Sequence, residues 1–387
     1  MEDLSIRQTK RIEEIDYLRG FAILAVVAIH TSANFTQIPN VNLLLIINVI
    51  IDVFSHFAVP LFIFISGFAL SIKYKGQFSQ KLFLQKRAKS ILPPYIIFST
   101  IYILYNISLS AINGNLKIPS IMTIIFNFLT ASSYSHLWYF ALIIQFYIFY
   151  PYIMKTYEKF ANNGKIFYFI FLVLITQQVW IIIKGTAIDY FDSSTYFNSI
   201  TYFNEIVYII LNRVFFSHIF YFIFGIYVCQ NYEYVIAQIS KAKKWILPTI
   251  ILLTGVISAF WINGMIKYGS YYSIPQSYFL VPYLLASIYY PFIFSILFIL
   301  TFSIIKNKYS NYSKTILLIG RYSFGIYLIH ALYIAIIVTL IFPQFGVDFN
   351  HLIFYPVLFI SSLLLSYFSV YLISYLPYSE IIIGIKK

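Results

Sequence analysis

Side chains that can do chemistry stand in one apolar stretch near the start of the chain, IDYLRGFAILAVVAIHTSANF, residues 15–35. Arg19 and His30 are eleven residues apart. At roughly 100° and 1.5 Å per residue, this spacing places both on one face of a helix, about 16 Å apart along its axis. Asp16 lies three residues before Arg19, close enough to pair with it. A histidine titrates near neutral pH and can take a proton from a hydroxyl, and an arginine can hold an anion.

This polar stripe has a purely structural interpretation, in which Asp16 and Arg19 form an interfacial ion pair and His30 is a packed, hydrogen-bonded residue. A polar stripe through an apolar helix more often lines a wet cavity or path, because ionisable groups are costly inside a bilayer. The next apolar stretch repeats the pattern with Asp52 and His56, which are four residues apart and can meet on a helix. The carboxylate could orient the imidazole or favour its charged form, or the pair could only hold helices together.

A basic run follows in KLFLQKRAKSILPPY, where Lys86, Arg87 and Lys89 precede two prolines. Such a run is typical of anchoring at the inner face of a membrane, and it could equally form a basic mouth for an anionic ligand such as a nucleotide phosphate.

Further candidates lie in three short segments. HLWYF contains His136 and Trp138, which could be interfacial anchors or face an acceptor. LNRVFFSH places Arg213 seven residues into an apolar stretch, with Glu205 two turns earlier as its predicted partner. The candidates in GRYSFGIYLIHALY are Arg321, which marks the start of a helix, and Ser323 and His330, which are seven residues apart and share a face.

The composition requires these elements to lie in a membrane. Of 387 residues, 60% are hydrophobic and 10% charged, and the mean hydropathy is +0.81. A soluble protein would be about a quarter charged. The net charge of +13 follows the alternate loops of a membrane protein, so we expect no nucleic-acid partner. The single cysteine excludes an internal disulfide, and no metal-ligand spacing is present, so we expect no metal.

The apolar runs predict an all-α polytopic membrane protein with about ten transmembrane helices. The predicted spans are 15–38, 43–72, 91–112, a broken region over 121–154, 165–184, 206–229, 245–264, 282–304, 322–342 and 352–376. Within the broken region we expect 137–154 to cross the membrane and the segment before it to lie in the interface or re-enter.

Loop charge predicts the orientation. Of the 26 Lys and Arg, 21 fall in the segments on one side, three on the other and two within spans, which predicts both termini in the cytoplasm. We therefore expect a cytoplasmic N-terminal segment (1–14), one transmembrane domain (15–376) and a cytoplasmic tail (377–387) in the cell membrane. The charged residues that interrupt the first apolar stretch favour an uncleaved helix over a signal peptide.

With these residues in place, the chain resembles the bacterial membrane-bound acyltransferase 3 family, ten-helix proteins that O-acylate cell-surface glycans and related acceptors. The resemblance rests on five motifs in the family's order: DYLRGFAILAVVAIH, VPLFIFISGF, the basic run into LPPY, HLWYF and SFGIYLIH. The spacing of Arg19 and His30 is the most specific of them. The residues that match the family's motifs are Arg19, His30, Arg87, Trp138, Ser323 and His330.

The resemblance implies acyl-CoA, commonly acetyl-CoA, as a cytoplasmic co-substrate, no tightly bound cofactor, and a surface glycan or lipid-linked sugar as acceptor. We expect His30 to act as general base, or to accept the acyl group first, and Arg19 to orient the donor. Asp16, Asp52, His56, Ser323 and His330 are expected to support them. The expected donor-binding residues are Lys86, Arg87, Lys89 and Arg321, and the expected acceptor-side residues are His136, Trp138 and Arg213.

Two other functions fit the same stretches. A transporter or exporter of a surface polymer or small solute would use the polar stripe as its pathway, and would be expected to break helices at matched positions of two halves. A non-catalytic scaffold in a glycan-assembly complex would not need His30.

Overall fold

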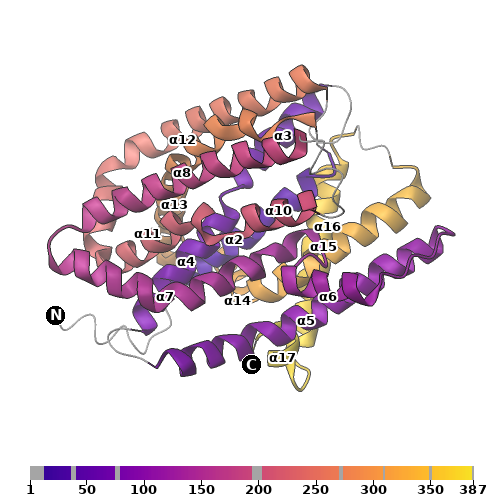
Figure 1. The fold of residues 1–387 in the computed structure, drawn as a ribbon, viewed down its shortest axis with the longest axis horizontal. Coiled ribbons are helices and arrows are strands. Elements are labelled where there is room, and N and C mark those ends of the chain that lie inside the picture. Colours follow the sequence, from indigo (N-terminus) through magenta and orange to yellow (C-terminus); the bar gives the residue numbers. More distant parts are fainter. Residues whose placement is uncertain are drawn as a thin grey trace.

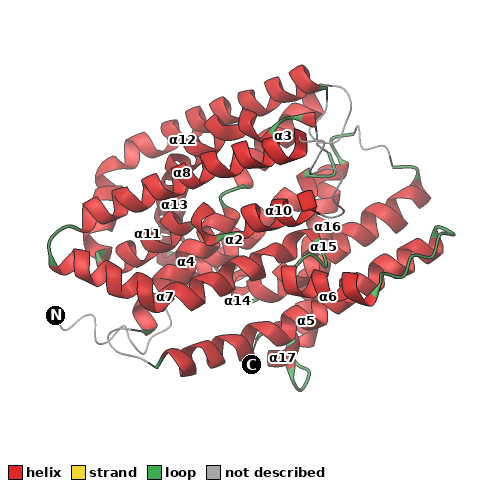
Figure 2. Cartoon of the chain, viewed as in Figure 1, coloured by secondary structure: helices red, strands yellow, loops and turns green. Residues whose placement is uncertain are grey.

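The computed structural model describes residues 13–35, 41–74, 79–193, 203–269, 273–307, 310–347 and 351–385. Over these ranges the protein consists of helices and their connections, without a strand (Figure 2). The prediction of an all-α polytopic membrane fold is confirmed.

The helices pack side by side as a bundle (Figure 1). They are α2 (Glu13–Ser32), α3 (Leu43–Ser55), α4 (Ala58–Lys73), α5 (Gln80–Ile112), α6 (Ile121–Thr130), α7 (Trp138–Asn162), α8 (Ile166–Ser193), α10 (Phe203–Arg213), α11 (Ile219–Gln230), α12 (Tyr232–Tyr268), α13 (Leu280–Lys306), α14 (Asn311–Arg321), α15 (Ser323–Ile336), α16 (Phe354–Ile373) and α17 (Ser379–Ile383). We call the end of the bundle that carries Lys86, Lys159 and Lys306 the basic end.

Within the described residues, nine helical segments are long and apolar enough to cross a membrane. The predicted sixth span, 206–229, is instead divided into α10 and α11, which both pack against α8 and together continue along it. Counting this divided span gives the ten crossings that the sequence predicts. The predicted second span is also interrupted, between α3 and α4 at His56 and Phe57.

Several predicted boundaries are wrong because helices continue past the apolar runs. The basic run at 81–89 was expected in a loop, yet α5 begins at Gln80, where the Ser79 side chain caps it. Lys241, Lys243 and Lys244 precede the predicted seventh span, 245–264, and were expected in a loop. They lie on α12 instead. Apolarity defines the part of a helix that lies in lipid, whereas caps and turns define where the helix ends.

Helix α2 is the central element of the bundle. It contacts α3, α4, α13, α14, α15 and α16, and 72% of its apolar window is buried inside the protein, against 22% for α5, α8 and α16. A helix surrounded by protein can carry polar side chains, because they face other helices rather than lipid. The Arg19–His30 stripe is therefore positioned inside the bundle.

Glycines allow two pairs of helices to approach at backbone distance. A Cβ built at Gly67 of α4 would lie 2.1 Å from the Phe222 carbonyl oxygen of α11. A Cβ built at Gly225 of α11 would lie equally close to the Phe64 carbonyl oxygen of α4. A Cβ at Gly320 of α14 would lie 1.8 Å from the Asp16 carbonyl oxygen on α2. Because lipid chains are as apolar as the side chains, such close packing of small residues is what holds membrane helices together.

Helix α6 does not cross the bundle. It runs back along α5 from the tip of a hairpin, and near the end of α6 that is far from this tip the Tyr95 hydroxyl of α5 donates to the Phe128 carbonyl oxygen at 2.6 Å. It ends at Ala131 in the left-handed conformation (φ 57°), and residues 131–137 then lead into α7. The expectation that this segment lies in the interface or re-enters is consistent with this path, and the crossing element is α7, as predicted from Leu137 onward.

Candidate functional site

Three histidine rings that are far apart in the sequence meet beside α2. His30 of α2 lies 5.1 Å from His330 of α15 and 6.0 Å from His136, measured between ring centroids, and His136 and His330 are 5.1 Å apart. We call these three residues the histidine centre. His136 and His330 are buried, whereas His30 keeps part of its surface accessible. His30 is therefore the most accessible member of the centre.

The hydrogen bonds of His330 fix its tautomer. Its Nδ1 lies 2.8 Å from the Tyr327 carbonyl oxygen and 3.1 Å from that of Ile326. Carbonyl oxygens only accept, so Nδ1 carries the proton and Nε2 presents a lone pair. That Nε2 atom is buried without a hydrogen-bond partner, as are both ring nitrogens of His136. Buried polar groups are normally satisfied, so these three nitrogens are candidates for bonding to a substrate or to water.

The segment before α7 places His136 in this centre. Tyr134 stacks on Tyr102 of α5 with 4.3 Å between ring centroids, and the Tyr327 hydroxyl donates to the His136 carbonyl oxygen at 2.5 Å. The Tyr102 hydroxyl in turn donates to the Leu328 carbonyl oxygen. His136 was predicted from its sequence position to lie on the acceptor side. The structure places it against the candidate base.

The predicted pairs on the first two spans are both present. The Asp52 carboxylate accepts from the Ser32 hydroxyl at 3.0 Å and lies 3.2 Å from His56 Nδ1. Asp16 pairs with Arg19 at 3.3 Å, and the Asp16 side chain is buried whereas 38% of the Arg19 side chain is exposed. Ser32 follows His30 by two residues, so the Asp52 network is anchored on the helix that carries the candidate base. Sequence analysis did not identify Ser32.

A row of polar side chains leads from the basic end toward the histidine centre. The Arg87 guanidinium lies over the rings of Tyr74, Phe83 and Tyr147 at 5.4–5.8 Å. Arg19 also lies within electrostatic range of the Tyr147 hydroxyl. An arginine held by aromatic rings keeps its donors available, and Arg87 Nε has no hydrogen-bond partner.

The row continues through Tyr139, whose hydroxyl also lies within electrostatic range of Arg19. Its ring is 5.7 Å from that of Tyr327, the residue that holds the His136 segment. The two ends of the α2 stripe are thus joined by tyrosines that the sequence did not single out. Tyrosines are so frequent in this chain that the sequence offered no reason to select these two.

The other expected donor-side residues lie at the surface of the basic end. Lys86 and Lys89 are exposed on α5, and Arg321 is exposed at the end of α14, the helix that packs on α2. Sequence analysis placed Arg321 at the start of the ninth span, whereas that span begins at Ser323. Ser323 is buried and, lying two turns from His330, makes no hydrogen bond to the histidine centre.

The expected acceptor-side residues border the break in the sixth span. The Trp138 ring stacks on His218 with 6.1 Å between ring centroids and an interplanar angle of 25°. Arg213 ends α10, and one of its terminal nitrogens is buried without a hydrogen-bond partner. The predicted ion pair with Glu205 is absent, although the structure describes both residues. His218, the last residue of LNRVFFSH, is thus a neighbour of the expected acceptor-side tryptophan.

Three side chains hold the segment where the sixth span is broken, and two of them, Gln145 and Gln177, bond its backbone. Gln145 donates to the Arg213 carbonyl oxygen at 2.7 Å and accepts from the Phe215 amide at 3.2 Å. Gln177 accepts from the Phe220 amide at 3.1 Å, and the Trp180 indole donates to the Ser217 hydroxyl at 3.0 Å. Irregular backbone at membrane depth requires such partners.

No group of three His, Cys, Asp or Glu residues among the described part of the chain could hold a metal ion. What the arrangement offers is an accessible imidazole, two buried imidazoles beside it and a carboxylate network on the same helix. These groups can accept a proton and stabilise the resulting positive charge. Basic residues lie at the other end of the polar row, so an anionic group can be held there while a reacting group extends toward the histidines.

The sequence profile of the acyltransferase domain of the acyltransferase 3 family matches residues 12–371. The chain belongs to the acyltransferase 3 family. The match covers every member of the histidine centre and the polar row, and it confirms the resemblance inferred from the five motifs.

Relatives of this family member include proteins of Staphylococcus aureus strains MRSA252, NCTC 8325 and N315, each described as a probable poly-beta-1,6-N-acetyl-D-glucosamine export protein. Each is 25% identical over 321 residues, which cover 82% of this chain and 81% of the relative. No solved structure matches. The family is thus that of membrane acyltransferases, and the relatives are named for export of a polysaccharide.

Proposed function

We propose that this protein is an O-acyltransferase of the cell membrane. It moves an acyl group, with acetyl as the first candidate, from acyl-CoA on the cytoplasmic side to a hydroxyl of a cell-surface glycan or a lipid-linked sugar. The observation that carries the proposal is the histidine centre: an accessible His30 beside two buried histidines with unpartnered nitrogens, at the far end of a polar row that begins at Arg19 and Arg87.

The donor end follows from charge. The concentration of Lys and Arg on one side supports a cytoplasmic basic end, which is where acyl-CoA is available. The exposed part of Arg19 and the ring-held guanidinium of Arg87 are suited to the phosphates or the thioester of the donor. Lys86, Lys89 and Arg321 add positive charge at the same surface.

In the proposed reaction, the histidine centre takes the proton of the acceptor hydroxyl. The acceptor hydroxyl oxygen attacks the thioester carbonyl carbon, the carbon–sulfur bond breaks, and the hydroxyl proton passes to His30 and then to the departing thiolate. His330 presents a lone pair at Nε2 next to His30, so it can orient the imidazole by accepting from its other N–H. The Asp52 carboxylate stabilises the imidazolium that forms, as the aspartate of a catalytic triad does. His30 could instead carry the acyl group as a covalent intermediate.

The test measures ester-linked acyl groups on the surface glycans of a deletion strain complemented with the native gene, with His30→Ala or with His351→Ala. His351 is an exposed histidine that is not part of the centre and serves as the matched control. We expect esters to disappear on deletion, to return with the native gene and the control, and to stay absent with His30→Ala at equal membrane abundance. Full acylation by the His30→Ala variant would refute the proposal.

A second candidate, export of a surface polysaccharide, is favoured by the printed names of the Staphylococcus aureus relatives. The transporter hypothesis expects broken helices at matched positions of two halves. The interruptions here fall in the second and sixth of ten crossings, which are not matched positions of two five-helix halves. Deletion separates the two functions, because loss of an exporter removes the glycan itself whereas loss of an acyltransferase removes only its esters.

A further inference from the structure

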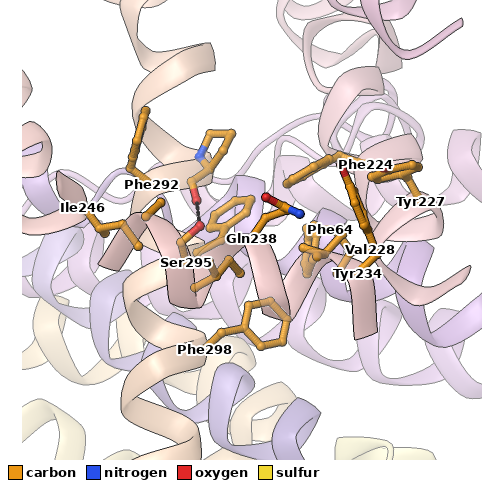
Figure 3. A pocket seen from close by; sticks show the side chains of 15 residues that line it. Phe64, Phe224, Tyr227, Val228, Tyr234, Gln238, Ile246, Phe292, Ser295 and Phe298 are labelled. Carbon is orange, nitrogen blue, oxygen red and sulfur yellow. Dashed lines mark hydrogen bonds between the residues drawn. The ribbon is translucent and has the colours of Figure 1, made fainter. Parts of the chain in front are cut away.

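An apolar cavity of about 290 Å³ is lined by the first half of α12 together with α4, α11 and α13 (Figure 3). Phe64 of α4 and Phe224 of α11 form part of its wall, close to the glycine crossing of these two helices. Gln238 and Ala242, which are exposed, form its lip on α12. The cavity lies apart from the histidine centre, which is built from α2, α15 and the segment before α7.

The chemistry of the wall favours a hydrocarbon occupant. Most of the lining side chains are aromatic or aliphatic. The Ser295 hydroxyl donates to the Pro291 carbonyl oxygen at 2.8 Å, so this polar group is already satisfied (Figure 3). The lining residues of α12 run from Tyr234 to Ile246, roughly 18 Å at 1.5 Å per residue. This length suits a stretch of a fatty acyl chain rather than a compact polar ligand.

The charge at the lip favours an anionic headgroup. Lys241 and Lys243 flank Ala242 on either side of the cavity-facing stripe, since neighbours on a helix point about 100° apart. Both are exposed, and neither has a carboxylate within ion-pair distance among the described residues. Lys244 projects from the other side of α12, next to an exposed Trp245. Lysines with a tryptophan are typical of a membrane–water boundary.

We propose that this cavity is a binding site for an anionic phospholipid of the leaflet at the basic end. One acyl chain fills the space between α12 and the α4–α11 crossing, and the phosphate lies on Lys241 and Lys243. Basic clusters beside gaps between membrane helices bind anionic headgroups in this way. The inference goes beyond acyl transfer and does not depend on it, because lipid binding is measured without any substrate.

The experiment measures lipid binding to the purified full chain by native mass spectrometry, with phosphatidylglycerol and phosphatidylcholine of identical chains as probes. The native protein is expected to bind phosphatidylglycerol about tenfold more tightly, since each lysine contributes a favourable interaction with the anionic headgroup. Lys241→Gln combined with Lys243→Gln should remove most of this preference. Lys155→Gln combined with Lys159→Gln removes two exposed charges from the same end and should leave it unchanged.

The acyl-chain half of the site is tested by closing the lip. Ala242→Trp should reduce binding of both lipids, whereas Ala237→Trp, an exposed position that does not line the cavity, should not. All of these positions are exposed, so the variants should remain folded. Equal binding of the two lipids by the native protein would overturn the proposal. So would equal loss of preference in both double variants, or unchanged binding by Ala242→Trp.

Discussion

The second and sixth spans are both interrupted, but the two breaks are built differently. At the break between α3 and α4, the Asp52 carboxylate pairs with His56 and accepts a hydrogen bond from Ser32 on α2. At the break between α10 and α11, neutral side chains from α7 and α8, Gln145 and Gln177 among them, satisfy the backbone. An uncharged amide is the inexpensive way to close a gap in a membrane helix, because it needs no counter-ion.

The difference indicates which break takes part in chemistry. Asp52 is only partly buried, and its carboxylate bonds Ser32 on the helix that carries His30, so its negative charge lies where it can act on that helix. At the sixth-span break, by contrast, neutral side chains only complete the backbone hydrogen bonds. The predictions below separate the two breaks by asking whether a substitution changes activity or folding.

The largest effect is expected at the crossing of the two interrupted spans. Gly225→Val places a side chain where a Cβ would lie only 2.1 Å from the Phe64 carbonyl oxygen, so α11 cannot keep its position on α4. We expect the variant to be lost from the membrane, as measured by immunoblotting of membrane fractions. Gly255→Val is the control, because a Cβ there meets no atom within 4 Å. Normal abundance of Gly225→Val would contradict the close backbone approach.

Asp52→Asn is expected to lower activity while leaving the fold intact. The amide still bonds Ser32, but it lacks the charge that stabilises an imidazolium, so acylation should fall by about 100-fold or more. The measurement is ester formation per amount of protein, with the melting temperature recorded in parallel. If Asn at this position lowers stability and preserves activity, the second-span break is structural like the sixth.

Gln177→Leu should show the opposite behaviour. It leaves the Phe220 amide without an acceptor and the Ser287 hydroxyl without a donor, and an unsatisfied buried group costs about 1–3 kcal/mol. We expect a lower melting temperature in detergent and unchanged acylation per folded molecule. Gln178→Leu, next to it but only partly buried, should be milder.

The smallest effect is expected for Trp180→Phe, which keeps an aromatic ring and removes only the 3.0 Å bond to the Ser217 hydroxyl. One such bond contributes about 0.5–1.5 kcal/mol. The same thermal assay should therefore place this variant between the native protein and Gln177→Leu. A change in acylation with unchanged stability would bring the sixth-span break into the mechanism.

The sequence predicted what local spacing determines. Residues three, four or eleven apart on one helix gave the Asp16–Arg19 pair, the Asp52–His56 pair and the position of His30 in the α2 stripe, and apolar runs gave the membrane spans. Helical periodicity is fixed by backbone geometry, so these relations follow without knowledge of the fold.

The sequence could not predict what distant contacts determine. His136 joins His30 because Tyr102 and Tyr134 stack and Tyr327 holds the connecting segment, and these partners lie on separate helices. The sixth-span break was missed because VFFSHIFYF is mostly apolar, and hydropathy does not reveal where backbone hydrogen bonds are replaced. The glycine crossings were also not predicted, because the sequence does not show which helix faces which.

The loose attachment of α6 has a consequence for how such proteins diversify. No residue of α6 is buried, and the Tyr95–Phe128 hydrogen bond ties it to α5. Mutations along residues 113–130 therefore disturb little else in the molecule. The sequence of this hairpin, at the end opposite to the basic end, can therefore change while the segment that carries His136 stays the same.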